Sequence, residues 1–177
     1  MRNRFTFARV GVAAALFLGL VALLPPSVAC GQEDGRTKIG TSGSNTGTEF
    51  VDKHLPKGAS VIGVKIRSGD WIDAVELLYK TADGKVESLG KHGGDGGEED
   101  TFMLEEGEHI TGITGKSGTY VMSLTIITNK RKSKTYGLGE GDVQYHYEVP
   151  HHDEIIGFFG RAADYVDQIG IWVQKRP

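Results

Sequence analysis

The residues best suited to chemistry lie in two aspartate-bearing loops, at 69–73 and 163–167. Each loop has carboxylates at its second and fifth positions with an aromatic residue between them, as Gly-Asp-Trp-Ile-Asp in one and Ala-Asp-Tyr-Val-Asp in the other. Ionised carboxylates accept hydrogen bonds from hydroxyl groups, bind metal ions or transfer protons. Two aspartates are too few ligands for a calcium loop, and Gly-Asp is also ordinary turn chemistry.

The two loops belong to a threefold internal repeat. Segments that begin at Lys57, Glu106 and His151 align without gaps, at spacings of 49 and 45 residues. Each segment reads as strand, loop, strand, and we call them the first, second and third repeats. The second repeat ends its loop in Met122 instead of an aspartate. All three share a glycine in the first strand and an aromatic residue in the loop: Gly63, Gly112 and Gly157, and Trp71, Tyr120 and Tyr165.

The elements that position these loops are predicted to be β-strands. Alternating segments such as VELLY at 75–79, SLTII at 123–127 and QIGIWV at 168–173 are typical of strands, and no stretch sustains a helical apolar period. Three hairpins separated by three glycine turns predict an all-β architecture with three sheets around a pseudo-threefold axis. The glycine turns lie at 43–47, 92–97 and 136–141.

Between residues 47 and 173 the ordered motifs resemble those of the jacalin-related lectins of the mannose-binding type. The motifs are LGKHGGDGG followed by FMLEEGEHITGITG, then SLTIITNKRKSKTYG, then EIIGFFGRAADYVDQIGIWV. The resemblance implies a lectin domain over 47–177 with a β-prism I fold of three four-stranded Greek-key sheets. It also implies that sugar binds at loops on one end of the prism, without a metal ion or other cofactor.

The resemblance further implies which residues bind sugar. In the family, backbone N–H groups and one aspartate carboxylate hold a hexose in a loop of glycine, three variable residues and aspartate. That loop matches Ala163, Asp164, Tyr165, Val166 and Asp167, with the turn around Gly47 as its second wall. Alanine stands at 163 where the family has glycine. A second site of some mannose-binding relatives matches in full, with a glycine turn facing it: Gly69, Asp70, Trp71, Ile72 and Asp73, and Gly93 and Gly94.

Mannose- or glucose-containing glycans are the partners that this resemblance implies. Galactose preference in the family goes with a freed glycine terminus beside the site, whereas this chain is continuous through Gly47. Each contact of such a site is modest, so a single site is expected to bind weakly. A homo-oligomer remains open, and it would strengthen binding through multivalency.

Structural interpretations of the same residues remain open. Asp73 and Asp167 could cap their turns, and Trp71 and Tyr165 could pack the loop ends instead of covering a sugar. The alternative function is therefore a β-prism scaffold for protein contacts whose sugar sites have decayed, which Met122 and the alanine at 163 favour. No nucleophile motif is present, which argues against an enzyme.

The segment 1–29 has the form of a signal peptide. Three arginines precede an apolar run from Val10 to Leu24, which is shorter than a membrane-spanning helix requires. Small residues before Cys30 admit ordinary cleavage, while SVAC resembles a lipoprotein box. We expect a secreted, periplasmic or cell-surface protein, and lipid anchoring at Cys30 remains open. Residues 30–46 are predicted to form a tether or the first strand edge.

The charge of the chain argues against nucleic acid as a partner. The formal net charge is −3, and removal of the three arginines of segment 1–29 would change it to −6. Acidic proteins are repelled by phosphate backbones, and the only basic run, KRKSK at 130–134, resembles a hairpin tip.

Overall fold

Each repeat folds as an antiparallel hairpin with the same two irregularities. Register shifts occur next to the shared glycine and again next to the loop in all three hairpins. Such bulges sharpen the twist of a hairpin, so their recurrence gives the three units one shape. The hairpins pair β4 (Ser60–Ser68) with β5 (Ile72–Lys80), β8 (Ile110–Ser117) with β9 (Val121–Thr128), and β11 (Asp153–Ala162) with β12 (Val166–Lys175).

This computed structural model describes residues 31–33, 35–139, 141 and 143–176. The predicted signal segment 1–29 and Cys30 lie outside the described residues. Within the described ranges no helix is long and apolar enough to cross a membrane.

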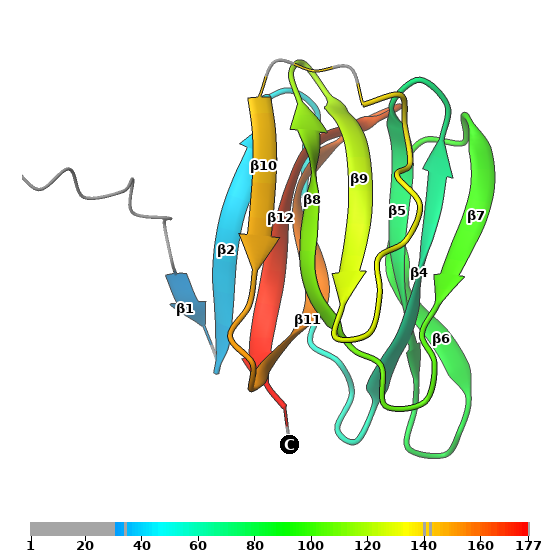
Figure 1. Cartoon of the computed structure of the whole chain (residues 1–177), viewed down its shortest axis with the longest axis vertical. Helices are drawn as coiled ribbons and strands as arrows, with labels where there is room; N and C mark the ends of the chain where they lie inside the picture. The colour runs from blue at the N-terminus through cyan, green and yellow to red at the C-terminus, as the bar shows by residue number, and fades with distance from the viewer. Residues whose placement is uncertain (1–30, 34, 140, 142, 177) are drawn as a thin grey trace, which may run out of the picture.

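The three hairpins are the centres of three antiparallel sheets (Figure 1). The first-repeat sheet has the order β6-β5-β4-β7, which is a Greek key of four strands, and the second-repeat sheet has the order β10-β8-β9. The third-repeat sheet has the order β1-β2-β12-β11-β3, so the two ends of the domain meet in it. The outer strands are β1 (Gly31–Glu33), β2 (Arg36–Gly43), β3 (Thr48–Val51), β6 (Val86–Gly93), β7 (Glu98–Met103) and β10 (Val143–Glu148).

The all-β prism predicted from the repeats is confirmed, and its strand counts differ in two places. The third-repeat sheet gains the short strand β1 at its edge. In the second-repeat sheet the fourth segment meets β9 only at isolated bridges, Leu124 with Tyr136 and Ile127 with Lys132. The hydroxyl of Ser133 accepts the N–H of Ile126 at 2.9 Å, which replaces a backbone partner and interrupts this ladder.

The core lies between the inner faces of the sheets. Alternate residues of β12, namely Ile169, Ile171 and Val173, point into it, as do Val64 and Ile66 of β4. Burial of each such side chain contributes about 1.5–3 kcal/mol. Trp172 has the opposite parity and lies on the outer face, where the guanidinium of Arg36 covers its ring at 4.1 Å from the ring centroid.

The buried carboxylate of Glu108 joins the second repeat to the turn after β9. It accepts hydrogen bonds from Thr128 Oγ1 at 2.6 Å, from the backbone N–H of Glu105 at 2.8 Å and from Arg131 Nε at 3.1 Å. Burial raises the pKa of Glu108, but these hydrogen bonds and the charge of Arg131 outweigh it and hold the pKa below 4.5. The ionised form is therefore favoured by folding.

We expect Glu108→Gln to lower the free energy of unfolding by about 2 kcal/mol at neutral pH, because it weakens charge-assisted hydrogen bonds. Since the folded pKa is below the unfolded one, the contribution of Glu108 is present above pH 4.5 and is lost as the pH falls below it. Urea unfolding at neutral pH and near pH 3 measures both effects. The exposed Glu106→Gln is the control, and an unchanged difference between wild type and Glu108→Gln at both pH values would contradict the assignment.

Candidate functional site

The three repeat loops lie together at one end of the prism, at the upper end of Figure 1. In each loop the N–H of the first residue donates to the carbonyl oxygen of the third. The distances are 3.1 Å from Gly69 to Trp71, 2.9 Å from Gly118 to Tyr120 and 2.9 Å from Ala163 to Tyr165. The three loops therefore have one local conformation.

The aromatic residues of the loops pack against one another. Ring centroids are 5.0 Å apart between Trp71 and Tyr120, 4.9 Å between Trp71 and Tyr165, and 4.9 Å between Tyr120 and Tyr165. We call this cluster the aromatic plug. Because each ring is occupied by its two neighbours, the main role of the plug is to hold the three loops in register.

Asp73 of the first repeat lies beneath the glycine turn that follows β6. Its Oδ2 accepts the N–H of Gly69 at 3.0 Å, and its carbonyl oxygen accepts the N–H of Gly94 at 2.9 Å. A Cβ added to Gly93 would lie 2.0 Å from that carbonyl oxygen. Gly93 and Gly94 thus hold the backbone of Asp73, while its carboxylate faces Gly96 and Gly97, which belong to the same turn but are not among the predicted site residues.

Asp167 of the third repeat has the matching position beneath the turn 43–47. Its Oδ1 accepts the hydroxyl of Thr46 at 2.5 Å, and its carbonyl oxygen accepts the N–H of Ser44 at 2.9 Å. A Cβ on Gly47 would lie 2.4 Å from its Oδ2. Asp167 is only 3% exposed, and its Oδ2 is buried. This buried oxygen has no hydrogen-bond donor among the described residues. An ionised oxygen left in this state can still accept a hydrogen bond.

Alanine at position 163 fits the conformation of its loop. The equivalent Gly69 has no left-handed φ, and a Cβ there would find its nearest atom, Gly97 Cα, at 3.8 Å. A Cβ on Gly118 would meet nothing within 4 Å. The backbone of these loops therefore does not require glycine at this position.

The remaining predicted residues lie on the rim or in the core. Ile72 and Val166 are buried beneath their loops. Asp70 and Asp164 are exposed. The backbone of Asp164 touches Gly94, where an added Cβ would lie 2.4 Å from the Asp164 carbonyl oxygen, so the turn of the first site also contacts the loop of the third.

The second loop has the same backbone frame without a carboxylate. A Cβ on Gly137 would lie 2.3 Å from the Met122 carbonyl oxygen, which repeats the close approach made by Gly93. A Cβ on Gly141 would lie 3.0 Å from Met122 Cγ, so a methylene group occupies this position. This loop offers no ionised acceptor beneath its turn.

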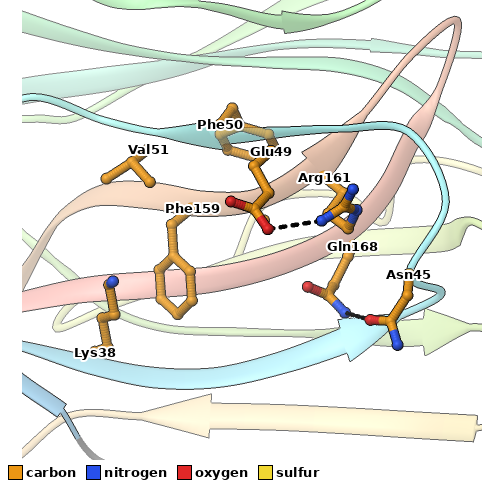
Figure 2. Close-up of a pocket in the computed structure, with 9 residues that line it drawn as sticks. Lys38, Asn45, Glu49, Phe50, Val51, Phe159, Arg161 and Gln168 are labelled. Atoms are coloured by element: carbon orange, nitrogen blue, oxygen red, sulfur yellow. Dashed lines mark hydrogen bonds and ion pairs between the residues drawn. The ribbon is translucent and has the colours of Figure 1, made fainter.

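A separate pocket of about 280 Å³ lies on the outer face of the third-repeat sheet (Figure 2). Phe159 and Val51 line it, and four of its polar side chains form two pairs. Arg161 Nη1 donates to Glu49 Oε1 at 2.8 Å, and Gln168 Nε2 donates to Asn45 Oδ1 at 3.1 Å. Asp167 does not line this pocket, so the candidate site is the loop end of the prism.

The other charged clusters are engaged in structural contacts. In the basic run, Lys134 pairs with Asp100 at 2.8 Å and Arg131 pairs with Glu108 at 3.1 Å. No group of three or more histidine, cysteine or acidic residues within the described ranges could hold a metal ion.

Comparison with known proteins gives a match to one domain family. The sequence pattern of the jacalin-like lectin domain matches residues 39–172. Horcolin of Hordeum vulgare is 37% identical over 142 residues, which cover 77% of this chain and 95% of horcolin. Myrosinase-binding protein 2 of Arabidopsis thaliana is 32% identical over 147 residues, which cover 78% of this chain and 18% of that protein.

A solved structure shows the same fold. The mannose-binding jacalin-related lectin from Ananas comosus superposes with a TM-score of 0.70 at 33% identity, covering 80% of this chain and 99% of that one. The match of the family pattern over most of the domain and the superposition of the prism lead to one conclusion. The chain belongs to the family of jacalin-like lectin domains.

Proposed function

We propose that this chain is a lectin that binds mannose- or glucose-type hexoses of glycans, without a metal ion, through Asp73 and Asp167. The observation that carries the proposal is the buried Oδ2 of Asp167, which has no donor among the described residues. A buried acceptor without a partner costs about 1–3 kcal/mol, and a sugar hydroxyl would supply the missing hydrogen bond.

The glycine turns explain why a hexose could approach these carboxylates. Gly47 lies against Oδ2 of Asp167, and Gly96 and Gly97 lie against the carboxylate of Asp73, so these three positions place no Cβ over the acceptors. The hydroxyl of Thr46, in the same turn as Gly47, donates to the other oxygen of Asp167, Oδ1. The N–H groups of Gly69 and Ala163 already bond within their loops, and the other backbone N–H groups of the loops would be the additional donors. Such a small set of directional contacts is consistent with millimolar binding of a monosaccharide, about −4 kcal/mol.

Methyl α-mannoside is the probe that tests this proposal. We expect it to change the fluorescence of Trp71, measured in a Trp172→Phe background, because Trp71 lies in the loop between Gly69 and Asp73. Methyl α-galactoside is the matched control and is expected to give no saturable change. If methyl α-mannoside also gives none, and the folded protein binds nothing on a glycan array, the lectin proposal is wrong.

A protein-interaction scaffold is the second candidate. Met122, which has replaced the acceptor in one of three loops, favours it, as does the similarity to a protein named for binding myrosinase. If the folded chain binds no glycan of the array, that result would support this candidate.

We also propose that segment 1–29 directs export and that the mature chain is secreted, periplasmic or held at the cell surface through Cys30. The form of that segment supports this proposal. The mass of the native amino terminus tests it, since lipid acylation of Cys30 adds mass that simple cleavage does not.

A further inference from the structure

Two arginines contact the glycine turns of the proposed sites in the same way. In the third repeat, Arg161 Nε donates to the carbonyl oxygen of Thr46 at 2.9 Å, and its Nη2 donates to that of Gly47 at 2.8 Å. Its remaining arm, Nη1, donates to Glu49 Oε1 at 2.8 Å. One guanidinium therefore holds two successive carbonyl groups of the turn while a carboxylate orients it (Figure 2 shows the pair with Glu49).

The first repeat has the same arrangement nitrogen by nitrogen. Arg67 Nε donates to the carbonyl oxygen of Gly96 at 2.8 Å, and its Nη2 donates to that of Gly97 at 2.9 Å. Its Nη1 donates to Glu99 Oε2 at 3.2 Å. Glu99 lies two residues after Gly97, as Glu49 lies two residues after Gly47. Both arginines immediately precede the register shift next to their loop.

The second repeat carries different residues at the equivalent positions. Lys116 occupies the place of the arginines, before the register shift of that hairpin. It pairs with Gln144, where Arg67 pairs with Glu99 and Arg161 pairs with Glu49. A lysine has one compact ammonium group, which cannot reproduce a planar fork over two carbonyl groups. This is also the repeat in which Met122 replaces the carboxylate. The arginine and the carboxylate are therefore present together in two repeats and absent together in the third.

The planarity of the peptide bond gives this contact a consequence for the site. In a trans peptide the C=O of one residue and the N–H of the next point in opposite directions. When Arg161 binds the carbonyl groups of Thr46 and Gly47, it directs the N–H groups of Gly47 and Thr48 away from itself. Gly47 adopts a left-handed φ of +70° and Gly97 one of +61°, so both turns are held in conformations that other residues rarely adopt.

We propose that Arg67 and Arg161 are positioning residues of the two sugar sites. Arg67 holds its glycine turn against the carboxylate of Asp73, and Arg161 holds its turn against that of Asp167. In both turns the arginine keeps the backbone N–H groups pointing away from the guanidinium. The inference rests on the proposed lectin function, which it deepens by naming residues that lie outside both loops and both turns.

The test uses backgrounds in which a single site remains. Asp73→Asn leaves the third-repeat site, and there Arg161→Lys is expected to weaken binding of methyl α-mannoside about tenfold, since the charge stays but the fork is lost. Asp167→Asn leaves the first-repeat site, where Arg67→Lys is expected to have the same effect. Lys116→Ala is the control in both backgrounds. Calorimetric titration gives the affinities, and urea unfolding shows whether the global stability has changed.

A second measurement separates this inference from the lectin proposal. In ¹H–¹⁵N spectra, Arg161→Lys is expected to shift the amide resonance of Gly47, and Arg67→Lys that of Gly97, while Lys116→Ala shifts neither. If the wild type fails to bind methyl α-mannoside, the lectin proposal fails, and these spectra alone decide whether the arginines position the turns. Unchanged glycine resonances would overturn the inference, as would full affinity in Arg161→Lys and Arg67→Lys.

Discussion

Replacement of both Asp73 and Asp167 by asparagine is expected to abolish binding of methyl α-mannoside. The side chains keep their size but lose their ionised acceptors, and each charge-assisted hydrogen bond contributes about 1.5–3 kcal/mol. Loss of one such bond per site lowers affinity about ten- to a hundredfold, which removes millimolar binding from the measurable range. Each single variant is expected to retain one site, so the stoichiometry in a calorimetric titration should halve.

A control with the same change of net charge is available far from the loops. Asp83→Asn combined with Glu106→Gln removes two exposed carboxylates elsewhere on the surface. This variant is expected to bind like the wild type. Undiminished binding by the Asp73→Asn, Asp167→Asn double variant would show that sugar, if bound, is bound elsewhere.

Gly93→Ala is expected to lower the free energy of unfolding and to disrupt the first-repeat site. Comparison with Gly90→Ala separates the two causes, which are backbone strain and a steric clash with Asp73. The φ angles are similar, +117° at Gly93 and +111° at Gly90. A Cβ on Gly90 meets nothing within 4 Å, whereas one on Gly93 would lie 2.0 Å from the Asp73 carbonyl oxygen. Gly90→Ala should therefore lower the free energy of unfolding by about 1–2 kcal/mol from backbone strain alone. Gly93→Ala should cost a further 1–3 kcal/mol or so from the clash.

The clash also has a consequence for sugar binding, because β6 must move away from Asp73 to accommodate the new methyl group. In the Asp167→Asn background, Gly93→Ala is expected to lose binding of methyl α-mannoside, and Gly90→Ala is expected to keep it. Urea unfolding and calorimetric titration measure the two effects. Equal stability of the two alanine variants would refute the close approach.

The fold could be predicted because each repeat has the same glycine position and the same alternating strand pattern in the sequence. Gly63, Gly112 and Gly157 lie next to register shifts, so each has a backbone reason to recur, and the alternating strands around them carry the core. The match of the family pattern and the superposition on a solved structure confirm the family and the all-β prism. The interrupted fourth segment of the second-repeat sheet was not predictable, because it depends on one hydroxyl, that of Ser133, competing for a backbone N–H.

The candidate site was predictable only where its residues lie close together in the sequence. Asp73 and Asp167 stand within loops that repeat, and the glycine turns could be paired with them by family resemblance. Arg67 and Arg161 lie in strands and bind turns 29 and 115 residues away, so their role depends on sheet pairing that a linear pattern does not display. The aromatic plug likewise exists only because three loops distant in sequence meet on one axis.

The aromatic plug places both proposed carboxylates at the same end of the prism, and this determines how one chain could attach to its target. Two contacts that open in the same direction grip a single glycan-bearing surface, and the second contact forms at a high effective concentration once the first is made. On the proposed function, a single chain therefore has one binding face, which carries both sugar sites. Joining two cells or particles would require a second copy facing the other way.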